Sequence, residues 1–568
     1  YWILRSLLTK ILLLVLLCMA QQGFAENSLE DVLWGKKPIS RSIQFEQLEK
    51  YVLKNDGENF SGILSLLPQP VGVGYNMIRD TRNLESKLLL ESSLVEKVRL
   101  TSDSGHVTSV GSKFVEQPSQ FFNIFFGTGV SSKIKGTNMR SVVMPIALMH
   151  KNANCVHNGV LIFFIEKQNT SDALVQVASE TCASLQFNYT GVFQTNYESQ
   201  PTSPRISNRI RSKDETEQTS APIEMLYDKY PSLLGALASS PIFEEDKVTL
   251  FGLIDKQVHY TSQCDTRAGQ YPMCNQLLLP SFSLAKSIAG ALSLSLIETQ
   301  FPYARESFLI DYLDVCRKDK WQNVTFENLS DMATGIYQSK KHYVDEDSPK
   351  HVQFIYDPKT NLDKIETACS LFQYRTTPGK RFVYHTSDTY LLGAAMNAFL
   401  KKNSKMTDYY SDVLIPYLTK RGFSDALQYS LRTKDTAQQA FTGWGMYFLR
   451  EDLFLLSILL HEAREASALE LHFLRDALNP TQDNSLVAIS TKNSFYKDIF
   501  YNNGFFSIKL NKRKFNCTED VWVPFMSGWG GITFVLLPNK MTYYFFSDGH
   551  THSFKEAIFA IHQVRPLC

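Results

Sequence analysis

The chain has 568 residues, of which 44% are hydrophobic and 20% are charged, and its net charge is +1 at pH 7. This is the composition of ordinary globular protein, with a length that suits about two or three domains. Because the charge is balanced and no nucleic-acid-binding motif occurs, we expect no nucleic-acid partner.

The first residues have the pattern of a signal peptide. Arg5 and Lys10 form a basic start, residues 11–17 are an apolar run too short to span a bilayer, and Gly23 and Ala25 are the small residues of a cleavage site. We therefore predict a signal peptide over residues 1–25 and a secreted or periplasmic protein, with a bacterial envelope favoured. The alternative is an uncleaved anchor, which would then be the protein's membrane contact.

The cysteine count fits an oxidising compartment. Nine cysteines are present, and leaving out Cys18 of the predicted signal peptide gives eight, an even number. Many connectivities are open to eight cysteines, and some could be buried thiols. Pairing of nearest neighbours in the sequence would give the disulfides Cys155–Cys182, Cys264–Cys274, Cys316–Cys369 and Cys517–Cys568.

Residues 26–195 form a predicted N-terminal domain of mixed helical and strand pattern, in which we find no catalytic motif. Four segments have the composition of strands, namely 98–102, 106–111, 159–166 and 173–179. Residues 196–222 are polar, contain Pro and Ser, and are almost free of large apolar side chains. We predict that they are a linker.

The second predicted domain covers residues 223–568. Its first part predicts a helix over residues 221–240 and a hairpin that turns at Asp255–Lys256. The stretch LLLPSFSLAKSIAGALSLSLIE, residues 277–298, predicts an apolar helix with Ser283 and Lys286 near its start.

The spacing of Ser283 and Lys286 suits a nucleophile and its base. Residues three apart lie on one helical face, and a serine hydroxyl needs a nearby base to attack a carbonyl. A lysine among apolar side chains has a lowered pKa and can serve as that base. The same Ser-x-x-Lys spacing occurs at Ser132/Lys135 and Ser494/Lys497, and a serine at a helix start is often only a cap.

The second domain resembles the serine hydrolases related to class C β-lactamases, penicillin-binding proteins and their esterase and amidase relatives. Five segments resemble that family's elements in order: FSLAKSIAGAL at 282–292, VTFENLSDMATGIY at 324–337, PGKRFVYHTSDTYLLG at 378–393, GWGMYFLREDLFLLSILL at 443–460 and SGWGGITFVLLPNKMTYYFFSDG at 527–549. The resemblance implies an α+β fold, in which an antiparallel sheet of about five strands is flanked by helices. An all-helical subdomain would hold the tyrosine loop.

The resemblance also implies the roles of particular residues. Ser283 would be the nucleophile, Lys286 its partner, and Tyr384 the general base and acid, with its pKa lowered by Lys286. The oxyanion hole would use the backbone N–H groups of Ser283 and Ile532, the latter after Gly531 on the edge strand. Neither a cofactor nor a metal is implied.

Two departures from the family pattern bear on the substrate. Thr386 stands where β-lactamases and peptidases have asparagine, and Trp529-Gly530-Gly531 stands where they have Lys-Thr-Gly. Tryptophan cannot bind a carboxylate as lysine does, because it offers one N–H donor and an apolar ring. These departures, together with YHTSDTYLLG, resemble family VIII carboxylesterases and 6-aminohexanoate-oligomer hydrolases.

The predicted function is therefore that of a secreted hydrolase of small ester, amide or peptide substrates. The alternatives are a β-lactamase or DD-peptidase, and a non-catalytic binding module with this fold.

Other candidate residues have weaker patterns. His550 and His552 could belong to a metal site, but two exposed histidines in a turn are the simpler interpretation. His385 is expected to be a neighbour of Tyr384 in its loop, and Trp444 and Tyr447 either line the cleft or pack in the core.

Overall fold

The structure is a computed structural model of the whole chain. It describes residues 28–39, 41–52, 59–67, 71–88, 97–111, 113–117, 119–167, 169–201, 219–237, 248–317, 319–341, 343–465, 471–490 and 496–568. The predicted signal peptide lies outside these residues. Within them, no helix is long and apolar enough to cross a membrane.

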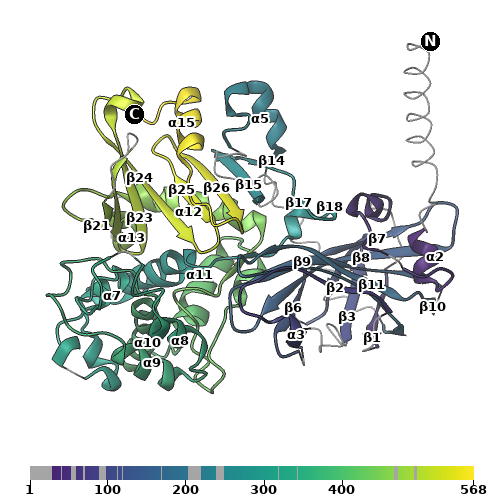
Figure 1. The fold of residues 1–568 in the computed structure, drawn as a ribbon, viewed down its shortest axis with the longest axis horizontal. Helices are drawn as coiled ribbons and strands as arrows, with labels where there is room; N and C mark the ends of the chain where they lie inside the picture. Colours follow the sequence, from purple (N-terminus) through teal and green to yellow (C-terminus); the bar gives the residue numbers. More distant parts are fainter. Residues whose placement is uncertain are drawn as a thin grey trace, which may run out of the picture.

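The N-terminal part is built on one antiparallel sheet (Figure 1). Its order is β13-β1-β3-β4-β7-β8-β9-β11-β12-β2, with β10 paired to β9 and β6 pairing both β5 and β8. Three of the four segments predicted as strands lie within β3, β9 and β11, and the fourth, 106–111, begins with β4 and extends two residues beyond it. The helices described in this part are short. They are α2 (Leu29–Leu33), η1 (Phe45–Tyr51) and α3 (Glu85–Leu88). The strands are β1 (Ser61–Leu66), β2 (Val71–Asp80), β3 (Lys97–Asp103), β4 (His106–Ser109), β5 (Phe114–Val115), β6 (Phe122–Phe126), β7 (Gly129–Lys133), β8 (Met139–His150), β9 (Val156–Glu166), β10 (Asn169–Thr170), β11 (Ala173–Thr181), β12 (Leu185–Phe193) and β13 (Thr195–Ser199).

Both ends of the predicted linker, residues 196–222, form strands in the structure. Its first residues belong to β13 and its last to β14 (Thr219–Pro222), whereas 202–218 lie outside the described residues. The predicted domain boundary therefore falls between the two sheets, and the linker itself stays a prediction.

The second sheet has the order β14-β16-β15-β26-β25-β24-β23-β22-β21 in the described part of the chain. It is larger than the sheet of about five strands that the resemblance implied, and it is antiparallel except where β14 pairs with β16. The predicted hairpin at Asp255–Lys256 joins β15 and β16. The strands are β15 (Val248–Asp255), β16 (Val258–Thr261), β21 (Leu486–Ser490), β22 (Tyr496–Asn502), β23 (Phe505–Leu510), β24 (Val521–Gly528), β25 (Ile532–Leu536) and β26 (Met541–Ser547).

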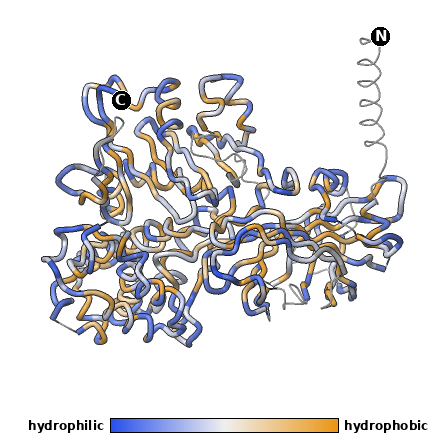
Figure 2. The backbone as a smooth tube through the Cα atoms, viewed as in Figure 1, coloured by the Kyte–Doolittle hydropathy of each residue, from blue (hydrophilic) through white to orange (hydrophobic). Residues whose placement is uncertain are grey.

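Both faces of the second sheet are covered, as the alternation of strand side chains requires. Ile532, Phe534 and Leu536 of β25 face a core that also contains Ile288 and Leu292 of the nucleophile helix. Val535 faces a second core with helices α5 and α15. Figure 2 shows apolar stretches along the strands and polar stretches at the outer loops. The helices of this half are α5 (Ile223–Lys229), η2 (Pro231–Leu233), η4 (Cys274–Gln276), η5 (Lys286–Leu292), α6 (Ser293–Gln300), α12 (Arg450–Glu465), α13 (His472–Leu478), α14 (Lys512–Phe515) and α15 (Lys555–Val564).

A helical region beneath the sheet holds the tyrosine loop, as the resemblance implied (Figure 1). It is built around the buried helix α10, whose first residue is Thr386. Its helices are η6 (Ala304–Glu306), η7 (Leu309–Asp311), η8 (Asp314–Cys316), η9 (Asp319–Trp321), α7 (Phe326–Ser330), α8 (Pro349–Tyr356), α9 (Asn361–Ser370), α10 (Thr386–Asn403), η10 (Tyr409–Leu414), α11 (Ile415–Lys420) and η11 (Asp425–Gln428).

The eight cysteines form the four disulfides that nearest-neighbour pairing predicted. Each bridge joins neighbours in the order of these cysteines along the chain, and this selects one of the many connectivities that the sequence left open. Four disulfides favour a location outside the cytoplasm.

Candidate active site

Ser283 lies in a tight turn that leads into the nucleophile helix. Leu279–Pro280 forms a short strand, β19, paired with β20 (Tyr447–Phe448), so the predicted helix begins several residues later than the apolar run. The turn places Phe282 at a φ of 39°, in the left-handed region that non-glycine residues rarely occupy. The helix then starts as a π-helical segment, η5, an irregularity that is often found at functional sites.

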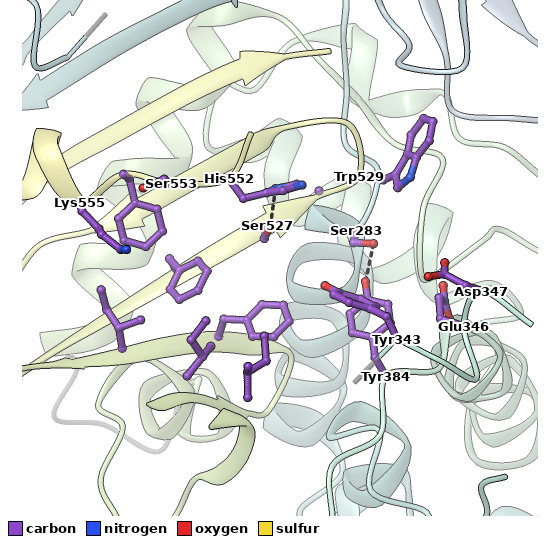
Figure 3. Close-up of a pocket in the computed structure, with 17 residues that line it drawn as sticks. Ser283, Tyr343, Glu346, Asp347, Tyr384, Ser527, Trp529, His552, Ser553 and Lys555 are labelled. Atoms are coloured by element: carbon purple, nitrogen blue, oxygen red, sulfur yellow. Dashed lines mark hydrogen bonds between the residues drawn. The ribbon is translucent and has the colours of Figure 1, made fainter. Parts of the chain in front are cut away.

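The structure brings the three predicted catalytic side chains together. The Tyr384 hydroxyl donates a hydrogen bond of 2.7 Å to Ser283 Oγ (Figure 3). Lys286 Nζ lies 3.4 Å from the same oxygen. Lys286 Nζ also donates to the Gly443 carbonyl oxygen at 3.2 Å and lies over the Tyr384 ring. Ser283 Oγ therefore lies within hydrogen-bond distance of both the Tyr384 hydroxyl and Lys286 Nζ.

Thr386 links Lys286 to the half-buried carboxylate of Glu346, which the sequence reasoning missed. Its Oγ1 accepts a hydrogen bond of 2.9 Å from Lys286 Nζ and donates to Glu346, and its backbone N–H donates to Glu346 at 2.8 Å. Burial opposes the charge of Glu346, but His351, Lys286 and Thr386 hold its pKa below the usual range. No local pattern marks Glu346, because it reaches the site from a loop that is remote in the sequence.

The pKa of Lys286 shifts in the expected direction, whereas the pKa of Tyr384 does not. Burial lowers the pKa of Lys286 to about 8, although Glu346 and Asp388 oppose the shift. Burial, with nearby Tyr343 and Glu346, raises the pKa of Tyr384 well above 10. The expectation that Lys286 lowers the pKa of the Tyr384 phenol is therefore wrong, because loss of solvent has the larger effect.

The residues that line the cavity at this strand end begin at Ser527, two residues before Trp529 of the predicted Trp529-Gly530-Gly531 motif. Trp529, Gly530 and Gly531 form the turn between β24 and β25, and Ile532 is buried in β25, which pairs with strands on both sides. Gly530, Gly531 and Ile532 do not line the cavity at Ser283. Of the four predicted positions, only Trp529 does, with 42% of its surface exposed.

The strand end that faces Ser283 is Ser527–Gly528 instead. The ladder between β23 and β24 ends at Phe506↔Phe525, so this end of β24 projects beyond its neighbour. A Cβ at Gly528 would lie 3.0 Å from the Ser281 carbonyl oxygen, which shows how closely strand and nucleophile turn approach. The strand edge that was expected beside Ser283 is therefore formed by Ser527, Gly528 and Trp529.

These groups open into a cavity of about 520 Å³. Its apolar wall comes from the face of the sheet. The polar side chains of Tyr343, Glu346, Asp347 and Tyr384 lie at the Ser283 end, and those of Ser553 and Lys555 lie at the other end (Figure 3). The lining residues are Ser283, Tyr343, Glu346, Asp347, Tyr384, Ile489, Ile499, Phe506, Ile508, Phe525, Ser527, Gly528, Trp529, His552, Ser553, Phe554 and Lys555.

Several other candidates lie elsewhere. His385 is buried behind the site, with Nε2 3.1 Å from Asp345 and Nδ1 3.4 Å from Asp388. Trp444 and Tyr447 are buried in the core and do not line the cavity.

His552 lines the cavity and contacts Ser527 Oγ at 3.3 Å. Among the residues that the structure describes, no group of three or more His, Cys, Asp or Glu side chains could hold a metal ion.

The sequence matches no protein-family model, and it matches none of the curated proteins. Solved structures similar to the chain include a proposed 6-aminohexanoate-dimer hydrolase from Bacillus anthracis, with 16% identity over 57% of this chain and 79% of the other, and a TM-score of 0.39. A penicillin-binding protein homologue from Caulobacter crescentus has 12% identity over 60% and 96%, with a TM-score of 0.41. A class C β-lactamase from Rhodobacter sphaeroides has 14% identity over 59% and 99%, with a TM-score of 0.41. These values describe a distant likeness to the family that the motifs resemble, so the chemistry of the site rests on this chain's own residues.

Proposed function

We propose that the chain is a serine hydrolase that cleaves ester or amide bonds through an acyl-enzyme on Ser283. The observation that carries the proposal is the position of the Ser283 hydroxyl. It is within hydrogen-bond distance of both the Tyr384 hydroxyl and Lys286 Nζ, and Ser283 lines a cavity that can hold a small molecule.

Lys286 is the better base in this arrangement. With a pKa of about 8 it is partly neutral near neutral pH, whereas Tyr384 keeps its proton and donates it to Ser283 Oγ. Ser283 Oγ attacks the substrate carbonyl carbon, and its proton passes to neutral Lys286 Nζ. The C–O or C–N bond then breaks, Tyr384 donates its proton to the leaving group, and the phenolate regains a proton from Lys286.

Hydrolysis of the acyl-enzyme reverses these roles. Water attacks the acyl carbon, a proton from that water returns to the Ser283 oxygen through the same pair, and the free acid leaves. The negative oxygen of each tetrahedral intermediate would accept hydrogen bonds from the backbone N–H groups of Ser283 and of Trp529 at the β24 end. Donors of this kind contribute roughly 10²–10³ in rate.

The cavity wall supports an apolar ester or amide as the substrate. The strand end that lines the cavity consists of Ser527, Gly528 and Trp529. It does not contain the lysine of the Lys-Thr-Gly motif. Ile499, Phe506, Ile508 and Phe525 offer an apolar surface for an acyl or alkyl group. The four disulfides support action outside the cytoplasm.

Parallel assays of the protein and Ser283→Ala with p-nitrophenyl butyrate and nitrocefin test the proposal. We expect ester turnover that disappears in the variant, and fluorophosphonate labelling of Ser283. Fast nitrocefin turnover would favour a β-lactamase. A chain with neither turnover nor labelling would be a binding module, and the proposal would fail.

A further inference from the structure

A buried asparagine of the N-terminal sheet reaches the base of the nucleophile turn. Asn154, between β8 and β9, is 1% exposed. Its Oδ1 accepts hydrogen bonds from the Phe282 N–H at 2.7 Å, the Gly445 N–H at 3.0 Å and Ser281 Oγ at 3.1 Å. Its Nδ2 donates to the Met446 carbonyl oxygen at 3.2 Å. All four partners belong to the hydrolase-like half of the chain.

These partners lie directly beside the catalytic groups. Phe282 precedes Ser283 and has a positive φ, a conformation that persists only when its surroundings fix it. Gly445 follows the segment whose Gly443 carbonyl oxygen accepts from Lys286 Nζ. One side chain of the N-terminal part therefore joins the backbone that presents the serine to the backbone that holds the lysine.

Asn154 is itself held firmly. It lies in the turn of the β8–β9 hairpin, where Met149 pairs with Val156 and the His150 N–H donates to the Cys155 carbonyl oxygen at 3.0 Å. The adjacent Cys155 is bonded to Cys182. A side chain on such a support can fix the position of its partners.

The same sheet also supports the opposite wall of the site. A Cβ at Gly530, in the turn after Trp529, would lie 3.5 Å from the Ala183 Cβ. Gln186 Nε2 donates to Asp548 Oδ2 at 2.6 Å, at the start of the segment that carries His552. The N-terminal sheet therefore contacts the backbone on both sides of the cavity.

We propose that Asn154 is a positioning residue for the Ser283 chemistry, and that the N-terminal sheet is a part of the active-site framework. Asn154 contacts neither the Ser283 hydroxyl nor the cavity. It acts through the Phe282 and Gly445 amides. The proposal rests on the proposed function for its kinetic effect, but the geometry that it explains is independent of the substrate.

Asn158 provides a matched control. It is also 1% exposed and crosses the same interface, where its amide group exchanges two hydrogen bonds of 3.0 Å with Leu278 N–H and carbonyl oxygen. Leu278 is five residues before Ser283, so loss of this contact removes interface hydrogen bonds without touching the nucleophile turn. Asn154→Ala and Asn158→Ala are compared in the full-length protein, with melting temperature, kcat and KM for p-nitrophenyl butyrate, and the rate of fluorophosphonate labelling.

For Asn154→Ala we expect the labelling rate and kcat to fall roughly tenfold to hundredfold, because small displacements of a nucleophile have effects of that size. KM should stay within about twofold, since Asn154 does not touch substrate. Asn158→Ala should keep its rate within about threefold while melting at a similar temperature. Asn154→Asp, which keeps the three acceptor contacts, should recover part of the rate.

Equal rate losses in the two alanine variants, or a change in KM in place of kcat, would overturn the proposal. Hydrogen exchange gives a readout that needs no activity. The Phe282 and Gly445 amides should exchange faster in Asn154→Ala than in the wild type and in Asn158→Ala, and unchanged exchange would also overturn it. A wild-type protein that is not labelled at Ser283 would count against the proposed function, whereas the exchange result would still decide the role of Asn154.

Discussion

Substitution of Glu346 by glutamine tests whether Lys286 is the base. A lysine with a pKa of about 8 is about 1% neutral at pH 6 and about half neutral at pH 8, so the acylation rate should rise roughly fiftyfold between these values. Glu346 is one of two carboxylates that raise this pKa against the effect of burial. Its removal should therefore move the midpoint of the pH–rate profile downwards. The assay is the rate of fluorophosphonate labelling from pH 5.5 to 10.

The neighbouring carboxylate supplies the control. Asp347 also lines the cavity but does not affect the pKa of Lys286, so Asp347→Asn should leave the midpoint where it is. An upward shift in Glu346→Gln, or equal shifts in both variants, would refute the assignment. A rate that falls as the pH rises through 8 would show that the reactive form of the site is the protonated one.

Three further predictions concern the framework. Gly528→Ala should slow labelling at least tenfold, because its Cβ would lie 3.0 Å from the Ser281 carbonyl oxygen and push the strand end away; labelling at unchanged speed would contradict this close approach. Replacing Cys155 and Cys182 by alanine should lower the free energy of unfolding by about 3–4 kcal/mol, the loop-closure effect for this separation, measured by guanidinium denaturation. Burial opposes the charge of His385, but two carboxylates raise its pKa from 6.5 to about 9, so its protonation stabilises the fold fully below pH 6.5 and this stabilisation is lost as the pH rises through 9. The difference in unfolding free energy between wild type and His385→Gln, about 3 kcal/mol at pH 6, should shrink by pH 10, and a constant difference would contradict the shift.

The segment Trp529-Gly530-Gly531 matches the family pattern, but a neighbouring residue makes the close contact with the nucleophile turn. Trp529-Gly530-Gly531 was singled out because it stands where the resembled family has Lys-Thr-Gly, and in the structure Gly530 and Gly531 have positive φ values. Those values serve the turn between β24 and β25, whereas Gly528, one residue before Trp529, makes the close approach to Ser281. Which glycine faces the nucleophile depends on where β23 ends, and this follows from sheet register rather than from the local sequence.

The contribution of the N-terminal half to the site could not be predicted from its sequence. Its sequence contains no catalytic motif, and the buried Asn154 is one polar residue in the segment NANC. In the structure it forms four hydrogen bonds across the interface. A buried polar side chain whose partners all lie in remote turns has no sequence signal, because those partners are more than a hundred residues away.

The sequence by itself determined the features that depend on near neighbours. The Ser283–Lys286 pair was predicted from its three-residue spacing, the strands from the pattern of apolar residues, and the disulfides by pairing neighbouring cysteines. Only the tertiary structure decided the features that depend on remote segments. These are the carboxylate of Glu346 beside Lys286, the strand end at Gly528, the support from Asn154 and the raised pKa of Tyr384. The physical reason is that solvent exclusion and charge pairing are set by what packs around a group, and the packing partners here come from distant parts of the chain.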